Sequence, residues 1–269
     1  MIRQGIPPVL RCAVWLSSIM KSCHPHESRE YASAYRTLGK VRQMDYAWDA
    51  VRDQIFPDES DERDAVAPTF GNEHHFSSLL QHDNNHVHTR GKREYTHVLY
   101  ALEHVLGLEY APLVPTMTGL LLRYMSSSYA FSALREMAQN ATWYFPVSRI
   151  EHVAWCRTFV DLLGRLHPRT ARRMKHVGLD PIFCHFFLPL LPYPHVVRIM
   201  DIYTYEGCKV LFRFGIALLS LFDAKVRTYE RNVYDTFFGN PNPWRVELTQ
   251  NPQLPLLLLG SFSLVVGNE

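Results

Sequence analysis

The 269-residue sequence lacks the motifs that mark several large classes of enzyme. It has no Walker A loop, no GxGxxG turn, no HExxH helix and no GxSxG turn, so it gives no indication of phosphate-loop, zinc-protease or serine-hydrolase chemistry. It also lacks an excess of either charge, since 28 Lys and Arg against 26 Asp and Glu give a net charge of +2. Nucleic acid is therefore not an expected partner, and any other anion must be bound by a local basic patch.

Cysteine is scarce and widely spaced. The chain has an odd number of cysteines and no CxxC pair; they are Cys12, Cys23, Cys156, Cys184 and Cys208. This spacing disfavours a disulfide framework or a zinc knuckle and favours a reducing compartment. We therefore predict no cofactor and no metal site.

Long apolar runs are also missing. No stretch reaches the roughly 20 apolar residues that a membrane span needs, and the longest, at 254–266, is broken by Gly260. Residues 12–20 are apolar, but Pro7 and Pro8 precede them and no small-residue cleavage site follows, so we predict no signal peptide. We expect a soluble chain.

Strand-like alternation is absent before residue 240, and apolar residues recur instead with a helical period. We predict an all-α chain with about ten helices. The first predicted helix has Val9, Leu10, Ala13, Val14 and Ile19 on its apolar face. The predicted helix at 149–166 has an apolar face made of Ile150, Val153, Ala154, Phe159, Val160 and Leu163.

Residues 56–93 are charged, rich in histidine and poor in periodicity, and we predict a long surface loop there. His82 and His86 have the spacing of a helical zinc pair, but Asn84 and Asn85 between them disfavour a helix. A polar loop is the favoured interpretation, and a metalloprotein built on this cluster remains a remote alternative. The histidines of the cluster are His74, His75, His82, His86 and His88.

Lys209 and Arg213 are four residues apart, hence neighbours on one helical face. Like charges so placed cost a few tenths of a kcal/mol unless an anion lies over them. Val210 and Phe214 are on the opposite face, so we expect the two cations to point outward. The alternatives are an anion site and an ordinary solvated face.

Two stretches, "GIPPVLRCAVW" at 5–15 and "HVVRIMDIYTYEGCKVLFRFGIALL" at 195–219, resemble the opening and closing motifs of TBC domains, the Rab GTPase-activating fold. The resemblance implies a two-lobed, all-α domain over residues 1–225 that engages Rab-type small GTPases in vesicle traffic. Residues 226–269 are then an irregular tail, interpreted as the stub of a lost C-terminal domain. The residues that match the motifs are Gly5, Arg11, Trp15, Arg198, Asp201, Glu206 and Gly207.

TBC activators supply an Arg and a Gln to the GTPase, and the resemblance locates both positions. In "APTF", Pro68 stands where the family has the Arg; in "EYAP", Tyr110 keeps its place and Pro112 stands where the family has the Gln. Proline cannot stabilise phosphoryl charge or orient water, so the resemblance implies a catalytically deficient domain. The alternative is a working activator that takes its arginine from elsewhere, such as Arg63 or Arg90.

The Tyr-x-Pro sequence, "WYFP" at 143–146 and "EGCKVLFR" at 206–213 resemble the Skywalker-type branch of the family, in which a TLDc domain follows the TBC domain. A cationic pocket binds phosphoinositide headgroups in that branch. The resemblance implies that Arg3, Arg213 and Lys209 do so here. Too few residues follow the TBC-like region for a TLDc domain. We expect a cytoplasmic protein that associates peripherally with vesicle or plasma membranes.

Overall fold

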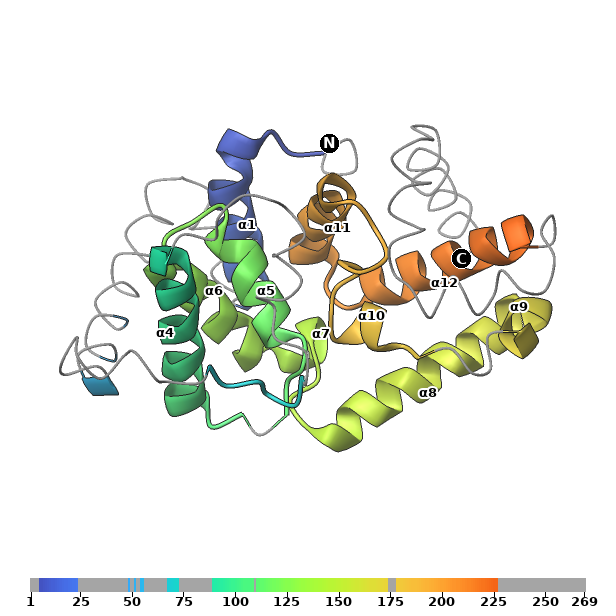
Figure 1. Cartoon of the computed structure of the whole chain (residues 1–269), viewed down its shortest axis with the longest axis horizontal. Helices are drawn as coiled ribbons and strands as arrows, with labels where there is room; N and C mark the ends of the chain where they lie inside the picture. The colour runs from blue at the N-terminus through green and yellow to red at the C-terminus, as the bar shows by residue number, and fades with distance from the viewer. Residues whose placement is uncertain are drawn as a thin grey trace. The chain divides into compact units, whose positions relative to one another are not determined.

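The computed structural model describes residues 5–23, 48, 51, 54–55, 67–72, 89–108, 110–173 and 178–226. All regular elements within these ranges are helices, which confirms the all-α prediction (Figure 1). The longer segments are α1 (Pro8–Cys23), α4 (Thr89–Leu106), α5 (Val114–Leu122), α6 (Ser127–Gln139), α7 (Ala141–Tyr144), α8 (Arg149–Leu166), α9 (Pro168–Arg173), α10 (Asp180–Phe183), α11 (Tyr193–Glu206) and α12 (Lys209–Val226).

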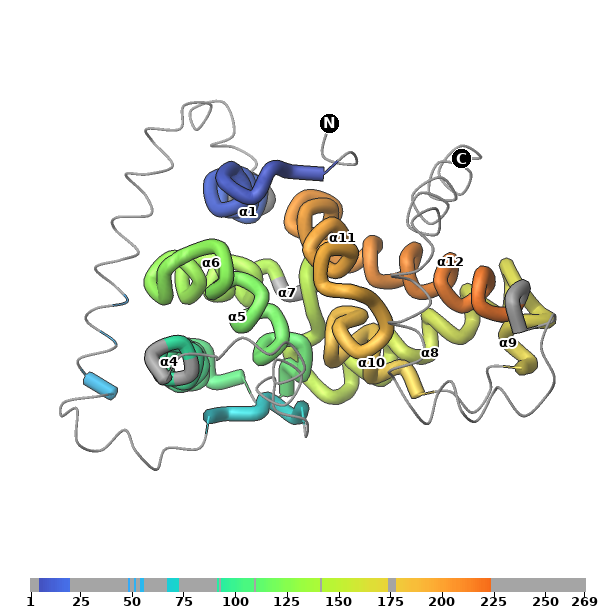
Figure 2. Tube along the Cα trace, turned by 45° about the horizontal axis from the view of Figure 1, so that its top comes forward, coloured from blue at the N-terminus to red at the C-terminus, as the bar shows by residue number. Residues whose placement is uncertain are grey.

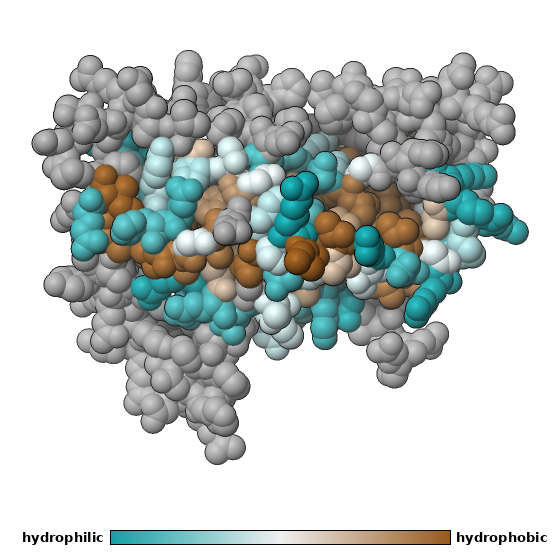
Figure 3. Space-filling model, turned by 90° about the horizontal axis from the view of Figure 1, so that it is seen from below, coloured by the Kyte–Doolittle hydropathy of each residue, from teal (hydrophilic) through white to brown (hydrophobic). Residues whose placement is uncertain are grey.

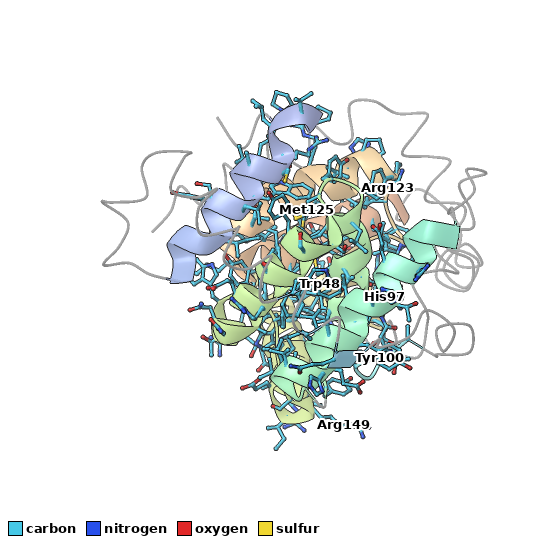
Figure 4. The ribbon with its side chains drawn as sticks, turned by 90° about the vertical axis from the view of Figure 1, so that its left-hand side faces the viewer. Trp48, His97, Tyr100, Arg123, Met125 and Arg149 are labelled. Atoms are coloured by element: carbon cyan, nitrogen blue, oxygen red, sulfur yellow. The ribbon has the colours of Figure 1, made fainter. Side chains whose placement is uncertain are left out.

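These helices belong to two compact units. We call the described residues within 2–149 the N-terminal unit and those within 150–269 the C-terminal unit. In the N-terminal unit α6 is central: it packs against α1, α4, α5 and α7 (Figure 2). Trp48, which Figure 4 labels, packs against the fully buried Phe131 of α6. Their ring centroids lie 5.3 Å apart. Burial of the apolar face of α6 stabilises the helix, because a helix of 13 residues is only marginally stable by itself.

The apolar face predicted for the first helix is wrong in part. Val9 and Leu10 are 91% and 53% exposed, whereas Ile19 is buried as predicted, together with Trp15 and Leu16. Leu10 lies nine residues before Ile19, which is two and a half turns at 3.6 residues per turn, and therefore on the opposite side of the helix. Apolar character alone did not identify the buried face.

The face predicted for α8 needs the same correction. Only His152, Phe159 and Leu163 are buried along this helix, while Ile150, Val153, Ala154 and Val160 are exposed. The buried stripe is narrow because Phe159 and Leu163 are one turn apart and His152 lies two turns before Phe159. Apolar side chains therefore reach the surface among polar ones, as they do on the side of the molecule shown in Figure 3.

In the C-terminal unit α11 packs on α12, which also contacts α9 and α10. Gly207, one of the motif residues, ends α11 with φ 70° and ψ −152°. Only glycine adopts this backbone conformation readily, because it has no Cβ. The segment at 182–191 contributes to the core, with Phe183, Phe186 and Phe187 fully buried.

Candidate functional site

The turn between α4 and α5 contains Pro112, and the structure places the segment around Pro68 directly against it. Residues 69–72 form a tight turn in which the Asn72 N–H donates to the Thr69 carbonyl at 2.9 Å. Phe70 and Gly71, at its centre, have φ values of 51° and 86°. Both central residues are left-handed, as in a type I′ turn.

Two hydrogen bonds join this turn to the chain after α4. The Ala111 N–H donates to the Phe70 carbonyl at 2.8 Å, and the Asn72 side-chain amide donates to the Pro112 carbonyl at 3.0 Å. The second bond is buried and spans 40 residues of sequence. These bonds fix the two segments relative to each other, and we call residues 67–72 and 110–112 the double-proline site.

Gly71 and Tyr110 are in contact across the double-proline site. A Cβ added to Gly71 would lie 2.4 Å from the Cδ2 and Cε2 atoms of the Tyr110 ring, so the ring covers the glycine directly. Real Cβ contacts are not this short, and the positive φ of Gly71 adds backbone strain for any other residue. Gly71 is therefore required for Tyr110 to lie where it does.

The structure thus brings together the two positions that the resemblance assigns to the Arg and the Gln. Neither position carries a donor side chain: Pro68 is half-buried, and Pro112 is buried and presents only its carbonyl, which Asn72 already occupies. Proline lacks an N–H as well, so the side chains at the two positions can neither neutralise phosphoryl charge nor orient a water molecule.

Two of the motif residues, Arg11 and Trp15, meet at Tyr124 within the N-terminal unit. The guanidinium carbon of Arg11 lies 5.2 Å from the centre of the Tyr124 ring, within cation–π range. The buried Trp15 ring packs edge-on against the same tyrosine at 5.0 Å. Arg11 and Trp15 thus anchor α1 to the helical core, and their role is structural. Gly5, with φ 99°, precedes α1.

The expected outward-facing cations of α12 differ from each other. Lys209 is exposed, whereas the Arg213 side chain is only 32% exposed and donates to the Glu206 carboxylate at 2.8 Å. Arg213 is therefore half-buried and ion-paired, which corrects the expectation that both cations point to solvent. Val210 and Phe214 are buried on the opposite face, as predicted.

The remaining motif residues lie on α11. Asp201 is fully buried, and Arg198 is half-buried. Burial lowers the pKa of the neighbouring His195, and the positive charge of Arg198 lowers it further. The other predicted site residues, Arg3, Arg63 and the histidine cluster at 74–88, lie outside the described residues, as does the Arg90 side chain.

The geometry of the double-proline site and the position of Arg213 can now be set beside known proteins. The profile of the Rab-GTPase-TBC domain family matches residues 71–226. The chain belongs to this family. The matched range includes Tyr110, Pro112 and the motifs of α11 and α12. Membership of the family supports a role in the regulation of Rab GTPases.

The TBC chain is similar to several curated proteins. It is 27% identical over 198 residues to the GTPase-activating protein skywalker of Drosophila melanogaster, which covers 68% of this chain and 32% of that protein. It is 41% identical over 69 residues to Carabin of Mus musculus, covering 23% of this chain and 16% of that protein. It is 28% identical over 131 residues to TBC1 domain family member 24 of Xenopus laevis, covering 45% and 23%. The chain spans about a third or less of the length of these relatives.

Two solved structures share the fold. The TBC domain of Skywalker/TBC1D24 from Drosophila melanogaster matches with a TM-score of 0.68 at 21% identity, over 96% of this chain and 82% of that one. The same domain in complex with inositol(1,4,5)triphosphate matches with a TM-score of 0.65 at 19% identity, over 97% and 88%. These likenesses support the Skywalker-type TBC fold that the sequence motifs indicated. Among the described residues, no helix is both long and apolar enough to cross a membrane.

Proposed function

We propose that this TBC domain binds Rab-family small GTPases without accelerating GTP hydrolysis, in the manner of a pseudo-activator. The observation that carries the proposal is the double-proline site, which brings together Pro68 and Pro112, the two residues that the resemblance assigns to the catalytic positions of the family. The hydrogen bonds from Ala111 and Asn72 support it, because they hold both prolines in place and leave little freedom for a nearby side chain to substitute.

The size of the expected effect follows from the chemistry of GTP hydrolysis. An arginine supplied in trans stabilises the charge that develops on the transferred phosphoryl group and typically contributes about 10³-fold or more to the rate. A glutamine that orients water adds a positioning effect. A domain without either group retains a binding surface, and its contribution to the rate is expected to be close to none.

Single-turnover GTP hydrolysis by a panel of Rab proteins, with and without this chain, tests the proposal. We expect binding of at least one Rab protein and a hydrolysis rate within about twofold of the intrinsic one. The same measurement on a Pro68→Arg, Pro112→Gln variant asks whether the site can be restored. Acceleration by the unmodified chain that is lost in an Arg63→Ala or an Arg90→Ala variant would establish the rival, a working activator with a displaced arginine.

We further propose that the exposed start of α12 binds phosphoinositide headgroups at a membrane surface through Lys209 and Arg213; Arg3, the third residue that the resemblance implies, lies outside the described residues. The inositol phosphate bound to the structurally similar Skywalker domain supports this ligand class. Arg presents a planar set of donors that suits phosphate oxygens, and Lys adds a second positive charge one turn away.

Glu206 bears on this second proposal in a specific way. Its carboxylate holds the Arg213 guanidinium at 2.8 Å, so a headgroup phosphate must either displace it or bind the donors that it leaves unused. Neutralising Glu206 removes a negative charge next to the bound anion and should therefore strengthen headgroup binding. Removing Arg213 or Lys209 should weaken it.

Flotation with liposomes that contain a phosphoinositide distinguishes these effects. We expect Arg213→Ala and Lys209→Ala to bind several-fold more weakly and Glu206→Gln more tightly. Arg165→Ala is the matched control, since it removes one positive charge from an exposed helical position of the same unit. Equal losses in Arg165→Ala and Arg213→Ala would reduce the interaction to overall charge and remove the site assignment.

A further inference from the structure

Two helices of the C-terminal unit each carry a pair of metal-ligating residues one turn apart. On α8, His152 and Cys156 are separated by four residues, and their Nε2 and Sγ atoms lie 3.7 Å apart. At α10, Asp180 and Cys184 have the same spacing, and the Cys184 Sγ atom lies 3.8 Å from the Asp180 Oδ1 atom. A spacing of four residues places both side chains on the same face of a helix, one turn apart.

The pairs approach each other through three of these residues, and Cys156 adjoins this group through His152. One ligand atom each of His152, Asp180 and Cys184 lies within 4.8 Å of the other two. Aromatic packing holds the helices that carry them together: the Phe183 ring lies 6.2 Å from Trp155 and 5.5 Å from Phe159 of α8, both edge-on. The cluster is therefore supported by a rigid apolar contact, as a preorganised site requires.

The observed distances suit a tetrahedral metal. With metal–ligand bonds of about 2.0 to 2.3 Å, the ligand atoms of a tetrahedral zinc site lie roughly 3.3 to 3.8 Å from one another. The separations within each pair already fall in this range, and closing the three-residue group needs a contraction of at most about 1 Å. Side-chain rotation at the exposed Asp180 can supply part of this movement.

We propose that His152, Cys156, Asp180 and Cys184 bind one zinc ion and so join α8 to α10. Two sulfur ligands and an imidazole favour Zn²⁺ over the oxygen-seeking Mg²⁺ and Ca²⁺. The burial pattern fits a site loaded from solution, because His152 and Cys184 are buried while Asp180 is exposed and leaves an entry path. Four protein ligands make the site structural, with no position left for a substrate.

Cobalt(II) and zinc binding to the chelator-treated 269-residue chain test the proposal. We expect one equivalent of Co²⁺ to produce a thiolate-to-cobalt charge-transfer band and the intense visible bands of tetrahedral cobalt, both lost when Zn²⁺ is added. The thiolate band should weaken in Cys184→Ser and in Cys156→Ser, because each variant keeps one of the two thiolates. Zinc affinity, measured by competition with a chromophoric chelator, should fall at least tenfold in Asp180→Asn.

Two controls locate the site. Cys208→Ser removes a half-buried cysteine of the same unit and should leave the spectrum and the stoichiometry unchanged. A His82→Ala, His86→Ala variant removes the pair suggested by the sequence and should also bind as the unmodified chain does. Circular dichroism checks that each variant is folded; if Cys184→Ser is not, the exposed Asp180→Asn carries the test.

The outcomes that overturn the proposal are definite. They are absence of a thiolate band in the unmodified chain, the same band in Cys184→Ser as in the unmodified chain, or binding that is lost in Cys208→Ser or in the double histidine variant. Each would show that the four side chains are joined only by their own hydrogen bonds.

Discussion

The double-proline site of the N-terminal unit and the polar clusters of the C-terminal unit differ in what holds them together. Backbone carbonyls, one amide side chain and a ring lying over a glycine hold Pro68 and Pro112 in position. In the C-terminal unit, charged groups are paired: Arg213 with Glu206, and Arg173 with the buried Asp223. Packing and backbone hydrogen bonds thus hold the double-proline site, while ion pairs hold charged side chains of the C-terminal unit.

This difference explains why the two proposals of function need different experiments. The double-proline site has a fixed shape and no titratable or charged group at its two key positions, so a substitution there changes stability and shape. The α12 site depends on charge, so a substitution there changes affinity for an anion and its dependence on salt. Substitutions at a packed, uncharged contact and at an ionic contact are therefore expected to differ in their effect on the free energy of unfolding.

The largest effect is expected for Gly71→Ala. The added Cβ would meet the Tyr110 ring at 2.4 Å, and alanine is strained at a φ of 86°. We expect the free energy of unfolding to fall by about 2 to 4 kcal/mol, since strain and a displaced ring act together. Urea denaturation followed by tryptophan fluorescence measures the change.

Gly164→Ala is the matched control for Gly71→Ala. No atom lies within 4 Å of the position that its Cβ would occupy on α8, and its backbone is helical. We expect it to stabilise the chain by about 0.5 to 1 kcal/mol, because alanine has the better helix propensity. A Gly71→Ala variant as stable as Gly164→Ala would mean that the Tyr110 ring moves aside easily and that the double-proline site is not rigid.

The sequence predicted the architecture well where a local signal determines it. The all-α class and the buried positions of Val210 and Phe214 both follow from helical spacing in the sequence. The buried faces of α1 and α8 could not be read in this way, because Leu10 and Val153 are apolar residues that tertiary packing leaves outside. Burial depends on the neighbouring helices, which periodicity does not identify.

The candidate sites were predicted to a similar extent. The family motifs located Pro68 and Pro112, yet only the tertiary hydrogen bonds from Ala111 and Asn72 show that the two segments meet. The Glu206 partner of Arg213 lies seven residues away across a helix junction, so helical spacing gave no sign of it. The two pairs of proposed zinc ligands do have a local signal, the repeated spacing of four residues, but 23 residues of sequence lie between Cys156 and Asp180.

A smaller effect is expected at the buried ion pair of the C-terminal unit. Asp223 is fully buried and accepts hydrogen bonds from Arg173 at 2.7 Å and from Thr170 at 3.0 Å. An Asp223→Ala substitution leaves the Thr170 hydroxyl buried without this acceptor, whereas Arg173 is 46% exposed and can turn to water. We expect a loss of about 1 to 3 kcal/mol in the free energy of unfolding.

Arg172→Ala is the matched control for the ion pair. Arg172 is exposed on α9, next to Arg173, and its Nε–H donates to a backbone carbonyl of the same helix. We expect a change within about 0.5 kcal/mol. A loss in Arg172→Ala equal to that in Asp223→Ala would count against a specific contribution from the ion pair.

The smallest effect is a dependence of stability on pH that arises in the C-terminal unit. Burial, together with the charge of Arg198, lowers the pKa of His195 in the folded chain below its usual 6.5. The unfolded chain therefore binds a proton more readily, and stability should fall as the pH drops below about 6.5 towards the folded pKa. His195→Gln removes this group, and its unfolding free energy should decline less between pH 7.5 and 5.5, as followed by urea denaturation at each pH. The His104→Gln variant, on the exposed surface of α4, should keep the original slope; if it flattens the slope as much as His195→Gln does, the pH dependence does not come from the buried face of α11.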